Sequence, residues 1–218
     1  MTSLQNKAGG FWRKFAVLLG LGRDSGPIGS VAALEHFVST RSAYVAQKTL
    51  YGYVKTRMGT RYVAMFEDKT MIASLNIAKM YVFAACLSDL SIYAVATAAF
   101  GHAVPNDSSQ ALARRCYMAG LRDNSAGAPA DFAVQECIDA FNRRLSETDW
   151  QRGARLPENF TQSPAALARW APIADSLKKH DTEIIENSVK FTWRDIREQF
   201  NKRLDAASVV ADWARQPP

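Results

Sequence analysis

The chain has 218 residues, of which 48% are apolar and 22% are charged, a balance that is ordinary for a globular protein and excludes a disordered, fibrous or plainly integral membrane protein. The 27 basic and 21 acidic residues give a net charge of +6, which favours anionic partners such as lipid headgroups or nucleic acid. The three cysteines stand far apart in no CxxC pair, which fits a reducing compartment and argues against disulfide bonds and a cysteine-based zinc site.

Residues 1–29 differ from the rest of the chain, and we expect a basic amphipathic arm followed by a linker. Four cations precede the first acid, Asp24, and at about 100° per residue the large apolar side chains of segment 11–19 share one arc. This pattern is typical of a helix in a membrane interface, with its rings inward and its cations toward anionic headgroups. Two other interpretations are an arm packed on protein and a signal peptide, which the short apolar run disfavours. The predicted membrane-interface residues are Phe11, Trp12, Arg13, Lys14, Phe15, Leu18 and Leu19.

The glycine- and proline-containing segment 22–29 separates this arm from residues 30–218, which we expect to form a single helical domain. Ser30 can cap a first helix that ends near Gly59. Within that helix Gly52 is expected at a point where another backbone comes close, because glycine is a poor helix former.

The same helix carries aromatic and basic side chains in neighbouring rows, each cation four residues after an aromatic. One interpretation is a surface for the phosphates of lipid or RNA. The other is a set of long stems lying over a core seam, one of which pairs with a buried acid on another helix. The predicted anion-binding residues are Arg41, Lys48, Lys55, Arg57 and Arg61.

Residues 68–102 are the longest apolar stretch, and we expect one long helix there, capped by Asp68 and ended near Gly101. Its apolar side chains occupy nearly every face, so the helix is either the buried hub of a bundle or a membrane span. Asp89 argues against a membrane span, because it lies at the middle of the apolar stretch, where placing a charged residue in the bilayer costs roughly 2.5–3.5 kcal/mol. We therefore expect a hub in which a cation from a neighbouring helix pairs with Asp89; a functional acid in a pocket is the other interpretation.

The sequence of the C-terminal half predicts further helices. We expect a short helix closed by Gly120, a second that runs to about Glu147, and a polar connector over 148–162 that is mobile or binds a partner.

Ser163 and Pro164 read as the N-cap and first residue of a helix, and Asp181 opens the last long one. No alternating strand pattern is present. The fold class predicted is all-α, a helical bundle around a long buried central helix with an N-terminal amphipathic arm.

Motifs that carry chemistry are scarce. The chain has no GxSxG, HExxH, P-loop or zinc pattern, and we expect no metal and no cofactor. Cys116 follows two arginines that could lower its pKa, which makes it a weak candidate nucleophile; a lone cysteine on a short helix is more often buried, and that is the favoured interpretation. A Ser-His-Asp set could be drawn from Ser88 or Ser91, His102 and Asp89, but this spacing carries little information, so the catalytic residues stay unknown.

The segments FVSTRSAYVAQKTLYGYVKTRMGTRY (37–62) and NIAKMYVFAACLSDL (76–90) resemble an uncharacterised family of alphaproteobacterial helical proteins labelled esterase, over about residues 30–105. The label implies ester hydrolysis. No family nucleophile maps onto a position of this chain, and the nucleophile elbow is missing.

Three functions follow. The leading expectation is a non-catalytic helical binding or assembly protein at the cytoplasmic face of a membrane, peripheral on its inner face, with anionic lipid and another protein as partners. The alternative is a hydrolase of small esters. The third is binding of nucleic acid or another polyanion through the basic helix 41–61.

Overall fold

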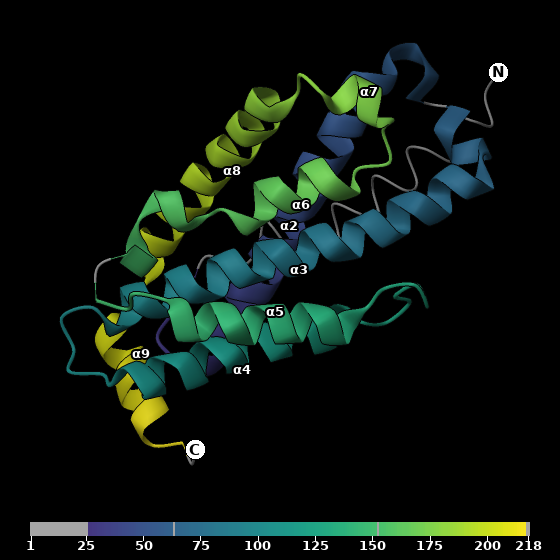
Figure 1. The fold of residues 1–218 in the computed structure, drawn as a ribbon. Coiled ribbons are helices and arrows are strands. Elements are labelled where there is room, and N and C mark those ends of the chain that lie inside the picture. Colours follow the sequence, from purple (N-terminus) through teal and green to yellow (C-terminus); the bar gives the residue numbers. More distant parts are fainter. Residues whose placement is uncertain (1–25, 63, 152, 217–218) are drawn as a thin grey trace.

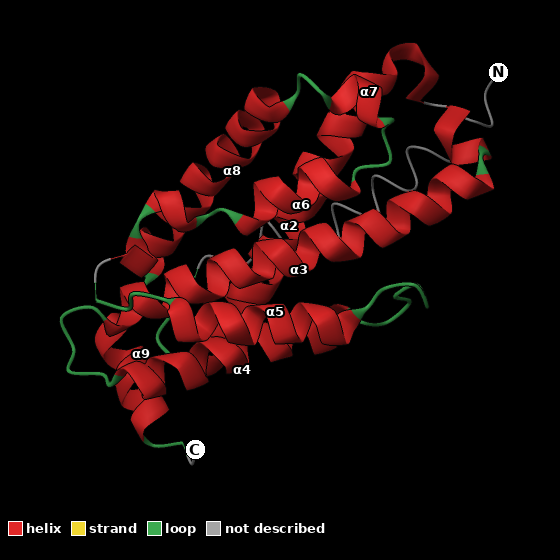
Figure 2. Cartoon of the chain, viewed as in Figure 1, coloured by secondary structure: helices red, strands yellow, loops and turns green. Residues whose placement is uncertain are grey.

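The computed structural model describes residues 26–62, 64–151 and 153–216, and in these ranges almost all regular structure is helical (Figures 1 and 2). The predicted all-α class is confirmed for this part of the chain; its only extended pairing is an isolated bridge between Ile28 and Leu204. The α-helices are α2 (Val31–Met58), α3 (Lys69–Ala99), α4 (Asn106–Asn124), α5 (Val134–Glu147), α6 (Gln162–Trp170), α7 (Asp175–Lys178), α8 (Thr182–Arg203) and α9 (Ala206–Ala214). Short 3-10 turns are η1 (Gly59–Tyr62), η2 (Ala64–Glu67), η3 (Gly153–Arg155) and η4 (Pro157–Asn159).

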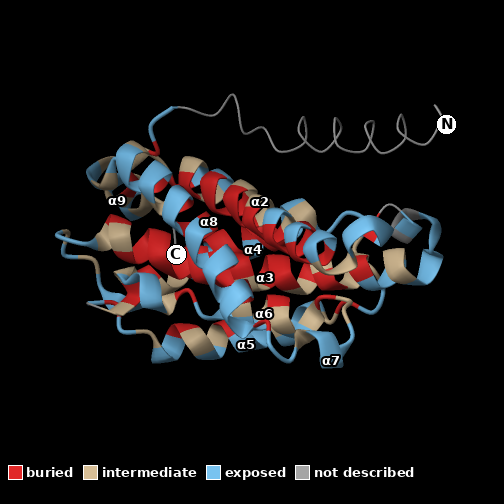
Figure 3. Ribbon diagram, turned by 90° about the horizontal axis from the view of Figure 1, so that it is seen from above, coloured by how far each residue is buried: buried red, intermediate tan, exposed pale blue. Residues whose placement is uncertain are grey.

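Helix α3 is the central helix of the bundle, as predicted. Its first turn is capped by Asp68, whose Oδ1 accepts from the backbone N–H groups of Thr70 at 2.8 Å and Met71 at 3.1 Å. The helix packs against α2, α4, α5, α6 and α9, and its side chains are buried on nearly every face from Leu75 to Ala98 (Figure 3). Among the described helices α3 alone has the length and apolarity of a membrane span, and most of that window is covered by its own protein.

The first described helix begins and ends where the sequence predicts. The Ser30 side chain accepts from the N–H of Ala33 at 3.2 Å, and Gly59 adopts φ = 54° at the end of α2, a conformation that suits glycine. Gly52, however, has open space where a side chain would lie, so the predicted close approach of a backbone there is wrong.

Two later elements differ from prediction. Helix α4 runs on to Asn124 and contains Gly120, which lies against Leu87 of α3 instead of ending the helix. Helix α6 begins at Gln162, so Ser163 is inside its first turn and is not the N-cap. Both differences occur where two helices pack together. The neighbouring helix determines the role of Gly120 and of Ser163, and the local sequence does not reveal that neighbour.

The start of the described chain is bonded to the junction of α8 and α9. Ile28 N–H donates to the carbonyl of Arg203 at 2.8 Å, and Asp205 N–H donates to the carbonyl of Ile28 at 3.0 Å. Ile28 is only 1% exposed, so this residue of the predicted linker belongs to the core. Asp212 of α9 adds a cap, because its Oδ2 accepts from Val31 N–H at 2.8 Å. The bundle is thereby closed at the junction of α8 and α9.

Candidate functional site

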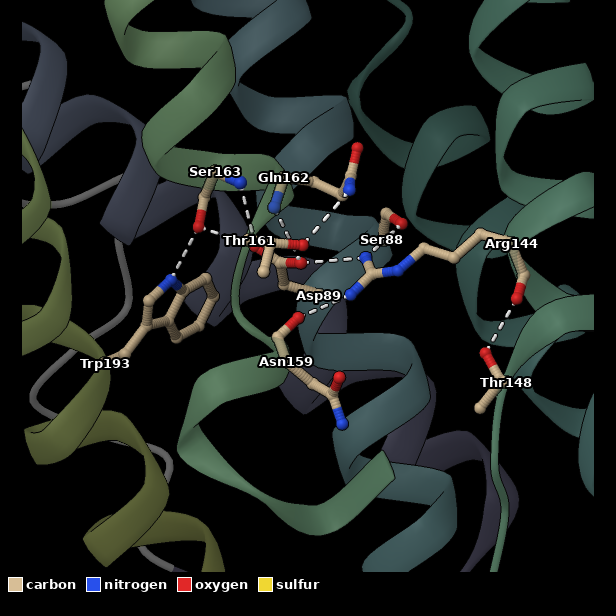
Figure 4. A network of polar contacts seen from close by, with 9 residues as sticks. All are labelled: Ser88, Asp89, Arg144, Thr148, Asn159, Thr161, Gln162, Ser163 and Trp193. Carbon is tan, nitrogen blue, oxygen red and sulfur yellow. Dashed lines mark hydrogen bonds and ion pairs between the residues drawn. The ribbon is translucent and has the colours of Figure 1, made fainter. Parts of the chain in front are cut away.

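The polar centre of the protein is Asp89, in the middle of α3 and 2% exposed (Figure 4). Its Oδ1 accepts from Arg144 Nη1 at 2.7 Å and from Gln162 N–H at 3.3 Å. Its Oδ2 accepts from the N–H and the hydroxyl of Ser163, at 2.8 Å and 2.6 Å. The carboxylate of one helix therefore caps the first turn of another, α6, where free amide hydrogens and the helix dipole favour a negative charge.

Arg144 supplies the positive charge and extends the network to two further elements. It comes from α5, and its Nη1 also donates to Ser88 Oγ at 2.8 Å while Nη2 donates to the carbonyl of Asn159 at 2.5 Å. The prediction that a cation on a neighbouring helix pairs with Asp89 is confirmed. The suggestion that this cation belongs to the basic row of α2 is wrong, because α5 faces Asp89.

Ser163 connects the network to α8. Its hydroxyl accepts from Trp193 Nε1 at 2.9 Å while it donates to Asp89, and both Ser163 and Trp193 are 1% exposed. The Ser163 hydroxyl and the Trp193 indole N–H thus both have hydrogen-bond partners. One cluster, which we call the Asp89 network (Ser88, Asp89, Arg144, Asn159, Gln162, Ser163 and Trp193), joins α3, α5, α6, α8 and η4 (Figure 4).

The electrostatics of this network indicate that it holds the helices together. Burial raises the pKa of Asp89 from its ordinary value, and the charge of Arg144 and the hydrogen bonds from Ser163 and Arg144 act in the opposite direction. A carboxylate with four donors has little capacity left to bind a substrate or to activate water. The pocket-acid interpretation of Asp89 therefore receives no support from these contacts.

A second buried acid, Asp181, was predicted only as a helix cap. It is 0% exposed and accepts from the hydroxyl of Tyr53 at 2.5 Å and from Arg57 Nε at 2.6 Å, both on α2. A further guanidinium nitrogen of Arg57 pairs with its other oxygen. The start of α8 is thus tied to the end of α2 by an ion pair that no local spacing could have indicated.

The predicted anion-binding row of α2 does not form one exposed surface. Arg41 is 3% exposed and lies over the Phe37 ring, and Arg57 is held by Asp181, so the prediction of an open row is wrong at these two positions. Lys48 lies 5.4 Å from the Tyr44 ring centroid, and Lys55 and Arg61 are exposed. Binding of polyanions through Lys48, Lys55 and Arg61 stays a prediction.

The structure does not assemble the Ser-His-Asp set. Ser88 Oγ accepts from Arg144. Helix α3 ends at Ala99, about 15 Å along its axis from Asp89 at about 1.5 Å per residue, and His102 lies three residues beyond that end. Among the described residues no group of three or more His, Cys, Asp or Glu side chains could hold a metal ion.

Cys116 does not have the environment of a nucleophile. Burial raises its pKa, as it does those of Cys86 and Cys137, the last to about 11. Arg115 acts in the opposite direction on Cys116 but does not overcome burial. The structure confirms the interpretation of Cys116 as a buried cysteine, and its burial argues against the alternative of a nucleophile.

We expect no fast-reacting thiol in the native protein at neutral pH, because a buried thiol rarely forms the thiolate that attacks a disulfide reagent. Ellman's reagent should label the buried Cys86 and Cys116 only after guanidinium is added, and the partly exposed Cys137 only slowly before that. A burst of labelling before unfolding, mapped by cysteine-to-serine substitutions, would contradict this.

Two hollows lie on either side of the Asp89 network. The larger, of about 390 Å³, runs between α6 and α8 and includes Phe160, Thr161 and Trp193. The smaller, of about 270 Å³, includes Ser88, Arg144 and Gln162. The larger hollow is the better candidate for a ligand, because its volume lies within the usual range of about 300–1,000 Å³.

The predicted membrane-interface residues Phe11, Trp12, Arg13, Lys14, Phe15, Leu18 and Leu19 lie outside the described residues. Their role stays a prediction.

Comparisons of the chain with models of protein families, with curated proteins and with solved structures found no match. The resemblance to the esterase-labelled family and the ester hydrolysis that it implies therefore stay predictions.

Proposed function

We propose that this protein is a non-catalytic helical binding protein that works at the cytoplasmic face of a membrane. In this proposal the arm within residues 1–29 contacts anionic lipid, and the helical body holds another protein at that surface. The pattern of rings and cations in segment 11–19 and the net charge of +6 both favour an anionic membrane surface.

The observation that carries the proposal is the attachment of the chain directly after the arm. Arg203 Nε donates to the carbonyl of Gly26 at 2.9 Å, and two backbone hydrogen bonds join Ile28 to the junction of α8 and α9. Because Ile28 is buried, the chain is fixed to the body at this residue. A lipid-bound arm would therefore hold the bundle close to the membrane.

The interior of the body supports a scaffold in preference to an enzyme. Its buried acids Asp89 and Asp181 are both engaged in holding helices together. Buried ion pairs of this kind set which helices meet, which suits a body that presents a defined surface to a partner.

The test is sedimentation of the full chain with vesicles that contain phosphatidylserine. We expect the wild type to sediment at low salt and less at high salt, because screening weakens the attraction of cations to the surface. The double substitution Arg13→Glu and Lys14→Glu should reduce binding by at least about tenfold, since each cation contributes about 1 kcal/mol near an anionic surface.

Phe15→Asp should reduce binding as well, by removing apolar contact. Lys179→Glu, a charge reversal at an exposed residue of the body outside the predicted anion-binding set, is the matched control and should leave binding within about twofold. A wild type that does not sediment with anionic vesicles, or arm variants that sediment as it does, would exclude the proposal.

A further inference from the structure

The hollow between α6 and α8, which we call the α6–α8 groove, has an apolar floor. Phe160 and Trp193 are buried there, their ring centroids 4.8 Å apart, and Ile185 and Val189 continue the same stripe of α8. The opposite wall comes from α6 and contains only small side chains, which leaves the space open. These are Pro164, Ala165 and Ala168.

Two cations of α8 border this floor. Lys190 and Arg197 lie one turn before and one turn after Trp193, on the same side of the helix. The Arg197 side chain lies over the Phe160 ring, 5.8 Å from its centroid, and its Nε is buried with no hydrogen-bond acceptor among the described residues. A buried donor without an acceptor is unfavourable, so an anionic ligand that supplies an acceptor here would be favoured.

Two acids also line the groove and limit the charge of a ligand. Glu158 and Glu186 border it together with Arg197 and Lys190. A phosphate or polyanion would bring more negative charge toward these acids than one carboxylate does. Glu186 stands eleven residues before Arg197 on α8, about 16 Å along the helix axis. The planar guanidinium also matches a carboxylate, which it can hold through two parallel hydrogen bonds.

We propose that the α6–α8 groove is a binding site for a free monocarboxylate with a linear apolar chain, such as a medium-chain fatty acid. The chain lies over Phe160, Trp193, Val189 and Ile185, and the carboxylate accepts hydrogen bonds from Arg197, with Lys190 nearby. This site is separate from the proposed lipid contact of the arm and does not depend on it.

The experiment is isothermal titration calorimetry of the full chain with decanoate, beside decan-1-ol and decyltrimethylammonium as neutral and cationic probes of the same length. We expect decanoate to bind at one site per chain and the other two probes to bind at least about tenfold more weakly. Only the carboxylate brings a negative charge to the Arg197 guanidinium; the alcohol can accept only a weaker, neutral hydrogen bond, and the ammonium is repelled.

Three substitutions localise the site. Arg197→Gln should weaken decanoate binding roughly ten- to a hundredfold, and Arg197→Lys should restore part of it through the retained charge. Ala168→Trp should block the groove and abolish binding. Arg194→Gln is the matched control, because Arg194 lies on the same helix with a side chain 59% exposed and should leave binding unchanged.

Circular dichroism melting checks the fold of each variant; should Ala168→Trp unfold the protein, the Arg197 pair decides. Phe15→Asp should bind decanoate as the wild type does, which separates this site from the arm. The proposal is overturned by absence of decanoate binding, by equal or tighter binding of either other probe, or by unchanged binding in Arg197→Gln.

Discussion

Replacing Asp89 by alanine should lower the free energy of unfolding by about 3–5 kcal/mol, the usual cost of removing one partner from a buried ion pair. The substitution leaves the Arg144 guanidinium, whose side chain is 18% exposed, without its carboxylate, and it leaves the amide hydrogens of Gln162 and Ser163 without their acceptor. Guanidinium unfolding followed by circular dichroism measures the change, with the slope m compared to show that both proteins unfold in the same way.

The matched control is Asp123→Ala, which removes an acid that pairs with Arg122 on the surface. Both of those side chains are at least half exposed, so the stability should change by less than about 0.5 kcal/mol. A double-mutant cycle with Arg144→Met should give a coupling energy of about 0.5–3 kcal/mol. If Asp89→Ala changes stability no more than Asp123→Ala does, the Asp89 network does not hold the helices together.

Substituting Gly120 by valine should destabilise the protein by about 1–3 kcal/mol, because α3 and α4 touch at this residue. A Cβ atom at Gly120 would lie 2.6 Å from Leu87 Cδ1 and 2.8 Å from its Cδ2, distances that require a shift. Leu87 is fully buried, so its side chain has little room to move. Thermal or denaturant unfolding of Gly120→Val measures the loss.

The comparison variant is Gly52→Ala in α2. No atom lies within 4 Å of a Cβ built there, so removing a helix glycine should stabilise the protein by about 0.5–1 kcal/mol. Adding Leu87→Ala to Gly120→Val should cost less than the two single changes summed, because the smaller side chain makes space. Equal responses at Gly52 and Gly120 would show that α3 and α4 do not approach as closely as described.

Neighbouring residues alone predicted much of the architecture. Asp68 and Ser30 cap their helices with their own side chains, and Gly59 ends α2 because its positive φ suits glycine. The apolar composition of residues 68–102 required α3 to be covered on all sides. All of these features act over a few residues along the chain, so a single sequence contains them.

The candidate sites were less predictable, because they depend on which helix faces meet. The α6–α8 groove is formed by small residues of α6 opposite Trp193 of α8, and neither segment carries a motif that marks a pocket. Arg197 was missed for the same reason: among the many cations of the chain, only its position beside Phe160 makes it distinct.

The sequence by itself thus determined the all-α class, the buried central helix and the ends of α2 and the start of α3, since caps, periodicity and backbone preference are local. Only the tertiary structure decided that Arg144, 55 residues from Asp89, supplies its counter-charge, that Ser163 bonds Asp89 instead of capping its helix, and that Arg41 is buried. The tertiary structure also reversed the expected roles of two glycines: Gly120 lies where another helix comes close, and Gly52 lies in open space. The physical reason is that helix packing brings together residues far apart in the chain, and each helix has several faces on which a given side chain could find its partner.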